Sequence, residues 1–269
     1  MTEPREKFVD VPGGHLHRRT RGEGRDVVLL NPGAADLRAW DTVTPWLERI
    51  ARVTTFDYRD TGLSSTSAEP YSELDDIAAV LADAGVRDAV LVGVSDGARR
   101  ALAFAHRRPD LVSHVVAVAG SFGEFPDATP GEEAARREMR AHFARLEKIK
   151  AADGLQARAE ADIDGWAPAL DVHQRRLMVG LQLANTHWVL LEEYLGTELD
   201  PPVKHRFAEI GVPVSVLVGG RDFEATRLWA RRLAAQAPGA TLTVVPEADH
   251  FPMLTAPDAF EGLIREVLG

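Results

Sequence analysis

Cysteine is absent from this chain of 269 residues. The absence excludes disulfides, thiol nucleophiles and metal sites built on cysteine. No apolar run approaches the roughly 18 residues that a membrane-spanning helix needs, and residues 1–7 are charged, unlike a signal peptide. No two histidines have the spacing of the zinc-binding motif H-E-x-x-H. We therefore expect a cytoplasmic protein that neither enters a membrane nor holds a metal ion.

An excess of positive charge is lacking as well. Lysine and arginine together number 31 against 41 aspartates and glutamates, which gives a formal net charge of -10. Such a chain is repelled by nucleic acid, so a nucleic-acid-binding role is not expected. Hydrophobic residues make up 45% and charged residues 27%, the balance of a soluble globular protein. The predicted partner is a small-molecule substrate, and assembly into a homodimer stays open.

Short apolar runs alternate with helix-like segments at both ends of the chain. This alternation predicts an α/β fold with a mostly parallel sheet, joined by right-handed crossovers and covered by helices on both faces. The predicted strands are residues 27–30, 52–56, 89–92, 114–119, 213–218 and 241–245. The predicted helices include 72–84, 98–105 and 226–236, followed by a final helix that ends the chain.

The pattern changes between residues 121 and 209, where apolar side chains recur at helical spacing and no strand-like run intervenes. We therefore predict a core formed by residues 1–120 and 210–269, with a helical cap at 121–209. Such a cap closes over the strand ends, so some of its side chains must line the binding pocket. Trp188 and Tyr194 are the candidates for that role.

Residues 93–97 read Gly-Val-Ser-Asp-Gly and lie between a predicted strand and a predicted helix. This layout is typical of a nucleophile elbow, in which a sharp turn lifts the serine above the sheet. Glycine two positions either side of the serine removes side chains that would clash in the turn. The turn also places Ser95 at a helix N-terminus, which favours developing negative charge.

Asp96 is the alternative nucleophile, because some enzymes with this turn use an aspartate. That frame would place Val94 and Ala98 at the two glycine positions, and valine fits poorly there. The glycines at 93 and 97 therefore favour Ser95.

A serine nucleophile needs a general base, and the base needs an acid that orients it. His250 follows the last predicted strand, and Asp222 follows the strand before it. The carboxyl ends of parallel strands meet at one edge of a sheet, so Ser95, Asp222 and His250 are predicted to converge. Asp222 could instead cap the next helix. Glu224 or Glu124 would then be the acid.

The oxyanion that forms during acyl transfer needs two hydrogen-bond donors. The backbone N–H of Asp96, directly after the nucleophile, is the first. The second should come from the loop after residues 27–30, where Pro32 has no N–H to donate. Gly33 is the first choice for it and Ala34 the second, and Ala34 is also a candidate substrate contact.

These motifs together resemble the α/β-hydrolase fold superfamily. Residues 31–41 are similar to the corresponding loop of 3-oxoadipate enol-lactonases, and residues 57–64 are similar to the superfamily's D-x-R-G-x-G-x-S stretch. Residues 249–260 resemble its G-H-F-P-x-x-x-x-P-x-x-F ending. The resemblance implies a cofactor-free serine hydrolase with a helical cap, in which Ser95, Asp222 and His250 form the catalytic triad.

The chain departs from that superfamily at several positions. Asn31 and Pro32 stand where His-Gly is common, and Asp60 and Asp249 each replace a glycine. Acidic side chains at 96 and 249, beside the nucleophile and the base, are expected to disfavour anionic substrates.

The predicted activity is hydrolysis of an ester or lactone of a small, largely apolar molecule through an acyl-enzyme. Two alternatives remain open. The same triad could serve a carbon–carbon bond hydrolase or a cofactor-free perhydrolase. The fold could also serve a non-catalytic small-molecule receptor.

Overall fold

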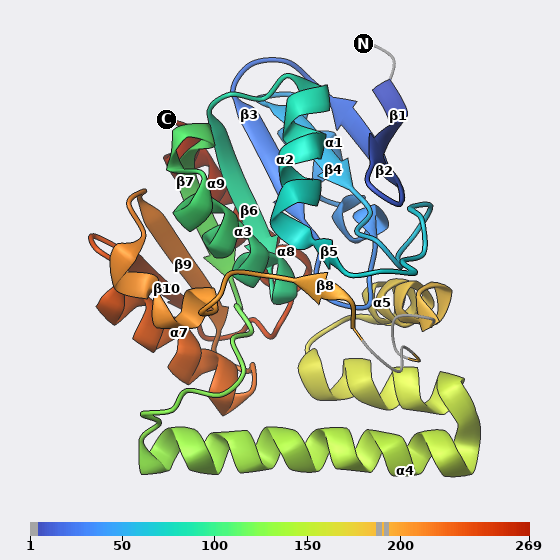
Figure 1. Cartoon of the computed structure of the whole chain (residues 1–269). Helices are drawn as coiled ribbons and strands as arrows, with labels where there is room; N and C mark the ends of the chain where they lie inside the picture. Colours follow the sequence, from blue (N-terminus) through green and yellow to red (C-terminus); the bar gives the residue numbers. More distant parts are fainter. Residues whose placement is uncertain (1–4, 187–189, 191–193) are drawn as a thin grey trace.

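A central sheet of eight strands organises the molecule (Figure 1). The computed structural model describes residues 5–186, 190 and 194–269. The strand order is β1-β2-β4-β3-β6-β7-β9-β10, with β1 and β2 antiparallel to their neighbours and the other strands parallel. The strands are β1 (Arg5–Val11), β2 (Gly14–Arg21), β3 (Asp26–Leu30), β4 (Arg52–Phe56), β6 (Ala89–Val94), β7 (Val112–Val118), β9 (Val214–Gly219) and β10 (Thr241–Val245).

Helices cover both faces of this sheet. One face packs against α2 (Glu73–Ala84), α3 (Asp96–Arg107) and α7 (Glu224–Gln236). The other packs against α1 (Thr44–Leu47), α8 (Pro252–Thr255) and α9 (Pro257–Leu268). Every residue of β6 is consequently buried, which explains its continuous apolar run. The α/β fold with a mostly parallel sheet, predicted from the sequence, is confirmed.

The caps of α2 illustrate how local signals set its ends. The Ser72 hydroxyl accepts a hydrogen bond from the Asp75 N–H at 3.1 Å, which satisfies one unpaired donor of the first turn. Gly85 ends the helix in the left-handed conformation, with φ 70°. These two caps explain why α2 begins and ends where the sequence predicts, after Ser72 and at Ala84.

Four of the described strands lack the apolar run that predicts a buried strand. The β1–β2 hairpin lies at the edge of the sheet and is rich in charge, so it lacks the apolar run of a buried strand. A second, two-stranded sheet pairs β5 (Tyr71–Ser72) with β8 (Gly196–Thr197). Strands of two residues leave no periodicity to detect.

Among the described residues between β7 and β9, two α-helices form the layer below the core in Figure 1. They are α4 (Pro130–Trp166), which is kinked at Gly154 with φ 87°, and α5 (Val172–Ala184). We call these two helices the helical layer. Short 3-10 helices complete the fold: η1 (Leu37–Trp40), η2 (Pro109–Leu111), η3 (Val203–His205) and η4 (Phe207–Glu209). None of the described helices is long and apolar enough to cross a membrane.

Candidate active site

Ser95 occupies the sharp turn between β6 and α3. Its φ of 57° and ψ of -115° are uncommon for a residue with a side chain and indicate a strained backbone. A Cβ on Gly93 would overlap the carbonyl oxygen of Gly97, and one on Gly97 would overlap that of Leu30. The close packing of β6, α3 and β3 at this turn therefore requires both glycines.

His250 and Asp222 lie together at the ends of neighbouring strands. His250 Nδ1 is 2.8 Å from Asp222 Oδ2, and both side chains are almost completely buried. An ionised carboxylate can only accept, so this contact places the proton on Nδ1 and leaves Nε2 free as a base. The other Asp222 oxygen accepts the N–H of Phe223 at 2.7 Å, which fixes the carboxylate.

The two alternative acids lie elsewhere. Glu124 is largely exposed and pairs with Arg136 and Arg140. Glu224 pairs with Arg227 and with Arg231 on the surface of α7. Neither contacts His250, so the geometry favours Asp222.

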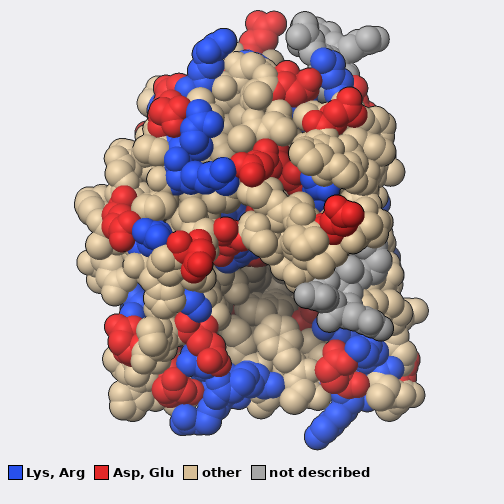
Figure 2. Space-filling view, viewed as in Figure 1, with Lys and Arg blue, Asp and Glu red and all other residues tan. Residues whose placement is uncertain are grey.

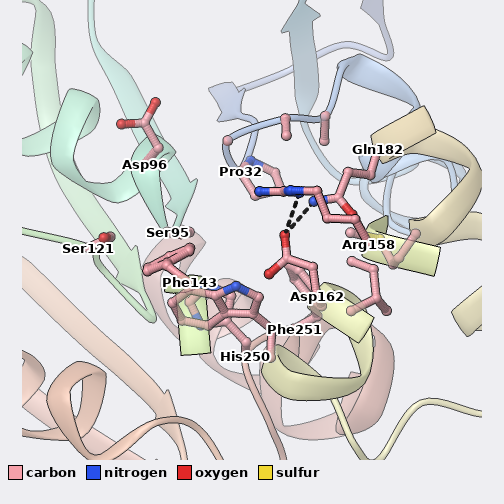
Figure 3. Close-up of a pocket in the computed structure, with 16 residues that line it drawn as sticks. Pro32, Ser95, Asp96, Ser121, Phe143, Arg158, Asp162, Gln182, His250 and Phe251 are labelled. Atoms are coloured by element: carbon pink, nitrogen blue, oxygen red, sulfur yellow. Dashed lines mark hydrogen bonds and ion pairs between the residues drawn. The ribbon is translucent and has the colours of Figure 1, made fainter. Parts of the chain in front are cut away.

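A cavity of about 360 Å³ opens between the strand ends and the helical layer. Figure 2 shows the molecule hollowed between the core and α4, with walls that are mostly uncharged. Ser95 and His250 both line this cavity (Figure 3). The structure records no hydrogen bond between them, a contact that commonly tightens only when substrate binds. Apolar side chains form much of the wall: Phe143, Ile163, Trp166, Met178 and Phe251.

Two backbone N–H groups predicted to bind an oxyanion lie next to Ser95. Gly33 and Asp96 line the cavity, and a Cβ on Gly33 would lie 3.7 Å from that of Asp96. Within the described part of the chain, neither N–H donates to a protein acceptor. Ala34 also lines the cavity, with a positive φ of 54°. Gly33, which lies beside Asp96, remains the first choice for the second donor.

The Asp96 carboxylate points away from the cavity (Figure 3). It accepts hydrogen bonds from Arg99 Nε at 2.8 Å and Arg100 Nε at 2.7 Å. Burial opposes ionisation, but the two guanidinium groups outweigh it and lower the pKa of Asp96. Its charge is therefore compensated at neutral pH, and its orientation does not suit a nucleophile.

Replacing Asp96 should cost stability. Asp96→Asn leaves Arg100, which is 2% exposed, with Glu73 as its remaining carboxylate partner. We expect the free energy of unfolding to fall by about 2–3 kcal/mol, because one partner of a buried ion pair is lost. Urea denaturation measures this change. The control is Asp110→Asn, whose exposed pair with Arg108 should contribute little. Equal effects of the two substitutions would contradict the prediction.

Asp249 and Trp166 join the His250 loop to the end of α4. The Asp249 carboxylate accepts the N–H groups of Ala169 and Phe251, each at 3.0 Å. The His250 N–H donates to the Trp166 carbonyl oxygen at 3.3 Å, and the two rings lie 4.3 Å apart. The Asp249 carboxylate is thus held by backbone N–H groups on both sides of the contact between the His250 loop and the end of α4.

The two aromatic residues expected to contact substrate have different outcomes. Tyr194 lies outside the cavity lining, where its hydroxyl accepts a hydrogen bond from Arg100 at 2.7 Å and contacts Glu73. The buried side chains of Arg100 and Glu73 therefore hold the Tyr194 ring in this position. Trp188 falls outside the described residues.

Three polar residues of the cavity wall were not predicted from the sequence. Arg158, Asp162 and Gln182 line it from the helical layer. Arg158 and Asp162 are one helical turn apart and flank apolar positions, which was the available signal. Among the described residues, no three His, Cys, Asp or Glu side chains are grouped so that they could hold a metal ion.

Comparison with known proteins agrees with this architecture. A model of the Alpha/beta hydrolase family matches residues 27–263. A 2-(acetamidomethylene)succinate hydrolase of Mesorhizobium japonicum is 27% identical over 269 residues, covering 93% of this chain and 90% of that protein.

Two solved structures share the fold at 23% identity, and each match covers 97% of this chain and 99% of the other. The enol-lactonase from Burkholderia xenovorans LB400 has a TM-score of 0.73. Est816, described as an N-acyl homoserine lactone degrading enzyme, has a TM-score of 0.75. Because the family model matches residues 27–263, the chain belongs to the alpha/beta hydrolase family.

Proposed function

We propose that this hydrolase cleaves an ester or lactone of a small molecule through an acyl-serine intermediate. One observation carries the proposal. Ser95 on its strained turn and His250, held by Asp222, open onto the same cavity. A nucleophile, a base and an orienting acid are the groups that acyl transfer requires.

The reaction would proceed in two halves. Ser95 Oγ attacks the carbonyl carbon while His250 Nε2 takes its proton, and the same nitrogen then protonates the leaving alcohol. Water next gives a proton to His250 and attacks the acyl carbon, which releases the acid and restores Ser95. Asp222 keeps the imidazole in the required tautomer and stabilises the imidazolium.

The oxyanion formed in each half would lie between the N–H groups of Gly33 and Asp96. Both amides are unpaired within the described residues, so they need no reorganisation to donate. Loss of one such donor typically costs about 10²–10³ in rate. The apolar wall would hold the carbon skeleton of the substrate while polar groups fix its orientation.

A fluorophosphonate probe tests the proposal, because it reacts with activated serines. We expect stoichiometric labelling at Ser95, mapped by peptide mass spectrometry, and hydrolysis of a panel of short aryl esters and lactones. Product analysis should give an acid and an alcohol, or a hydroxy acid from a lactone. An acid and a ketone would instead indicate cleavage of a carbon–carbon bond. Absence of labelling together with absence of turnover would contradict the proposal.

A further inference from the structure

Three polar side chains of the helical layer line the cavity opposite Ser95 (Figure 3). Arg158 and Asp162 come from α4, and Gln182 comes from α5. The side chains of Arg158 and Asp162 are only 11% and 8% exposed, and Gln182 is buried. We call these three residues the polar wall.

Asp162 holds the other side chains of the polar wall in place through its carboxylate. Its Oδ2 accepts a hydrogen bond from Gln182 Nε2 at 2.5 Å, and its Oδ1 lies 3.2 Å from His142 Nε2. Because a carboxylate only accepts, it holds the Gln182 amide with the NH₂ group toward itself. The Gln182 carbonyl oxygen is thereby turned away from Asp162.

Two groups of the polar wall lack hydrogen-bond partners. Arg158 lies 3.5 Å from Asp162 and 3.5 Å from Glu147, and it donates no hydrogen bond to any residue that the structure describes. The buried Gln182 Oε1 likewise accepts none from the described residues. Buried polar groups in native proteins are nearly always paired, so these two require an explanation. A substrate in the cavity would supply the missing partners.

Charge and donor pattern together indicate the chemistry of that partner. The Asp162 carboxylate already compensates the Arg158 charge, and the Gln182 oxygen would repel a carboxylate. A neutral group that carries an acceptor beside a donor fits the N–H groups of Arg158 and the carbonyl oxygen of Gln182. Resting on the function proposed above, we propose that the polar wall binds a carboxamide at the end of the substrate remote from the reacting carbonyl. Its oxygen accepts from Arg158, and its N–H donates to Gln182 Oε1.

Matched aryl esters test this assignment. The acyl chains end in a carboxamide, a carboxylate or an isopropyl group of similar shape, at several chain lengths, with the rate in buffer subtracted. We expect kcat/KM for the carboxamide to exceed that for the isopropyl ester by about 10- to 100-fold, as a hydrogen bond to a charged group provides. Arg158→Met should bring this ratio toward one, and Gln182→Met should lower it.

The matched control is Arg145→Met, which removes an exposed arginine of the same helix that does not line the cavity. The ratio should stay at its wild-type value in this variant. Thermal unfolding of each variant shows whether the helical layer remains intact. A wild-type enzyme with no preference, or one whose preference survives Arg158→Met in a folded protein, would overturn the proposal. A preference for the carboxylate ester would also overturn it.

Calorimetry separates this inference from the proposed function. The Ser95→Ala variant is titrated with the carboxamide acid of each chain length and with the isopropyl acid of the same length. Tighter binding of the carboxamide, lost in Ser95→Ala/Arg158→Met, supports the subsite even where no ester is hydrolysed. Equal binding of the two acids overturns it even where Ser95 proves to be the nucleophile.

Discussion

Ser95→Ala should reduce kcat for ester hydrolysis by about 10⁶-fold and abolish fluorophosphonate labelling. The reason is chemical: without Oγ, water must attack the substrate directly and no acyl-enzyme forms. The unpaired amides of Gly33 and Asp96 remain in the variant, so a small residual rate over buffer is expected. Initial rates and active-site titration measure both effects. The alanine side chain fits the turn, so the unfolding temperature should stay close to that of the wild type.

Ser121 provides a matched control, because it is another serine of the same cavity. Ser121→Ala should retain labelling by the probe, since His250 and the glycine-framed turn serve Ser95. Labelling that persists in Ser95→Ala and disappears in Ser121→Ala would contradict the assignment of the nucleophile.

Asp222→Asn should lower kcat by about 10⁴-fold while leaving the fold intact. Asparagine would present its NH₂ group or its oxygen to His250 Nδ1. An NH₂ group there favours the tautomer protonated on Nε2, which cannot accept the serine proton. The imidazolium of the transition state also loses the carboxylate 2.8 Å away. Pre-steady-state kinetics with an aryl ester should show that the acylation step slows.

The two glutamates considered as alternative acids are the controls for Asp222→Asn. Glu124→Gln and Glu224→Gln remove surface ion pairs and should change kcat little. A large loss in either variant, with Asp222→Asn retaining most of its activity, would transfer the orienting role to that glutamate.

Elements buried on both faces of the sheet were the ones that the sequence predicted well. The runs at 27–30 and 89–92 are apolar, and the run at 52–56 is rich in β-branched residues, because helices cover these strands and bury their side chains. The sequence of the β1–β2 hairpin is not set by burial. Its residues are polar because they lie at an edge, and pairing between backbones determines the strands.

The candidate site divides in a similar way. Ser95, Asp222 and His250 follow strands, so the topology of a parallel sheet brings them to one edge whatever the side chains between them. Residues of the helical layer have no such constraint. Which of them reach the cavity depends on the kink at Gly154 and on the packing of α4 against α5, and neither can be read from helical periodicity alone.

The attachment of the His250 loop to the end of α4 has a consequence for thermal inactivation. Two hydrogen bonds tie that loop to the end of α4: the Ala169 N–H donates to Asp249, and the His250 N–H donates to the Trp166 carbonyl oxygen. Warming that loosens the layer would therefore misalign the imidazole while the eight-stranded sheet is still intact. The temperature at which turnover fails would then report the undocking of α4, below the temperature at which the core melts.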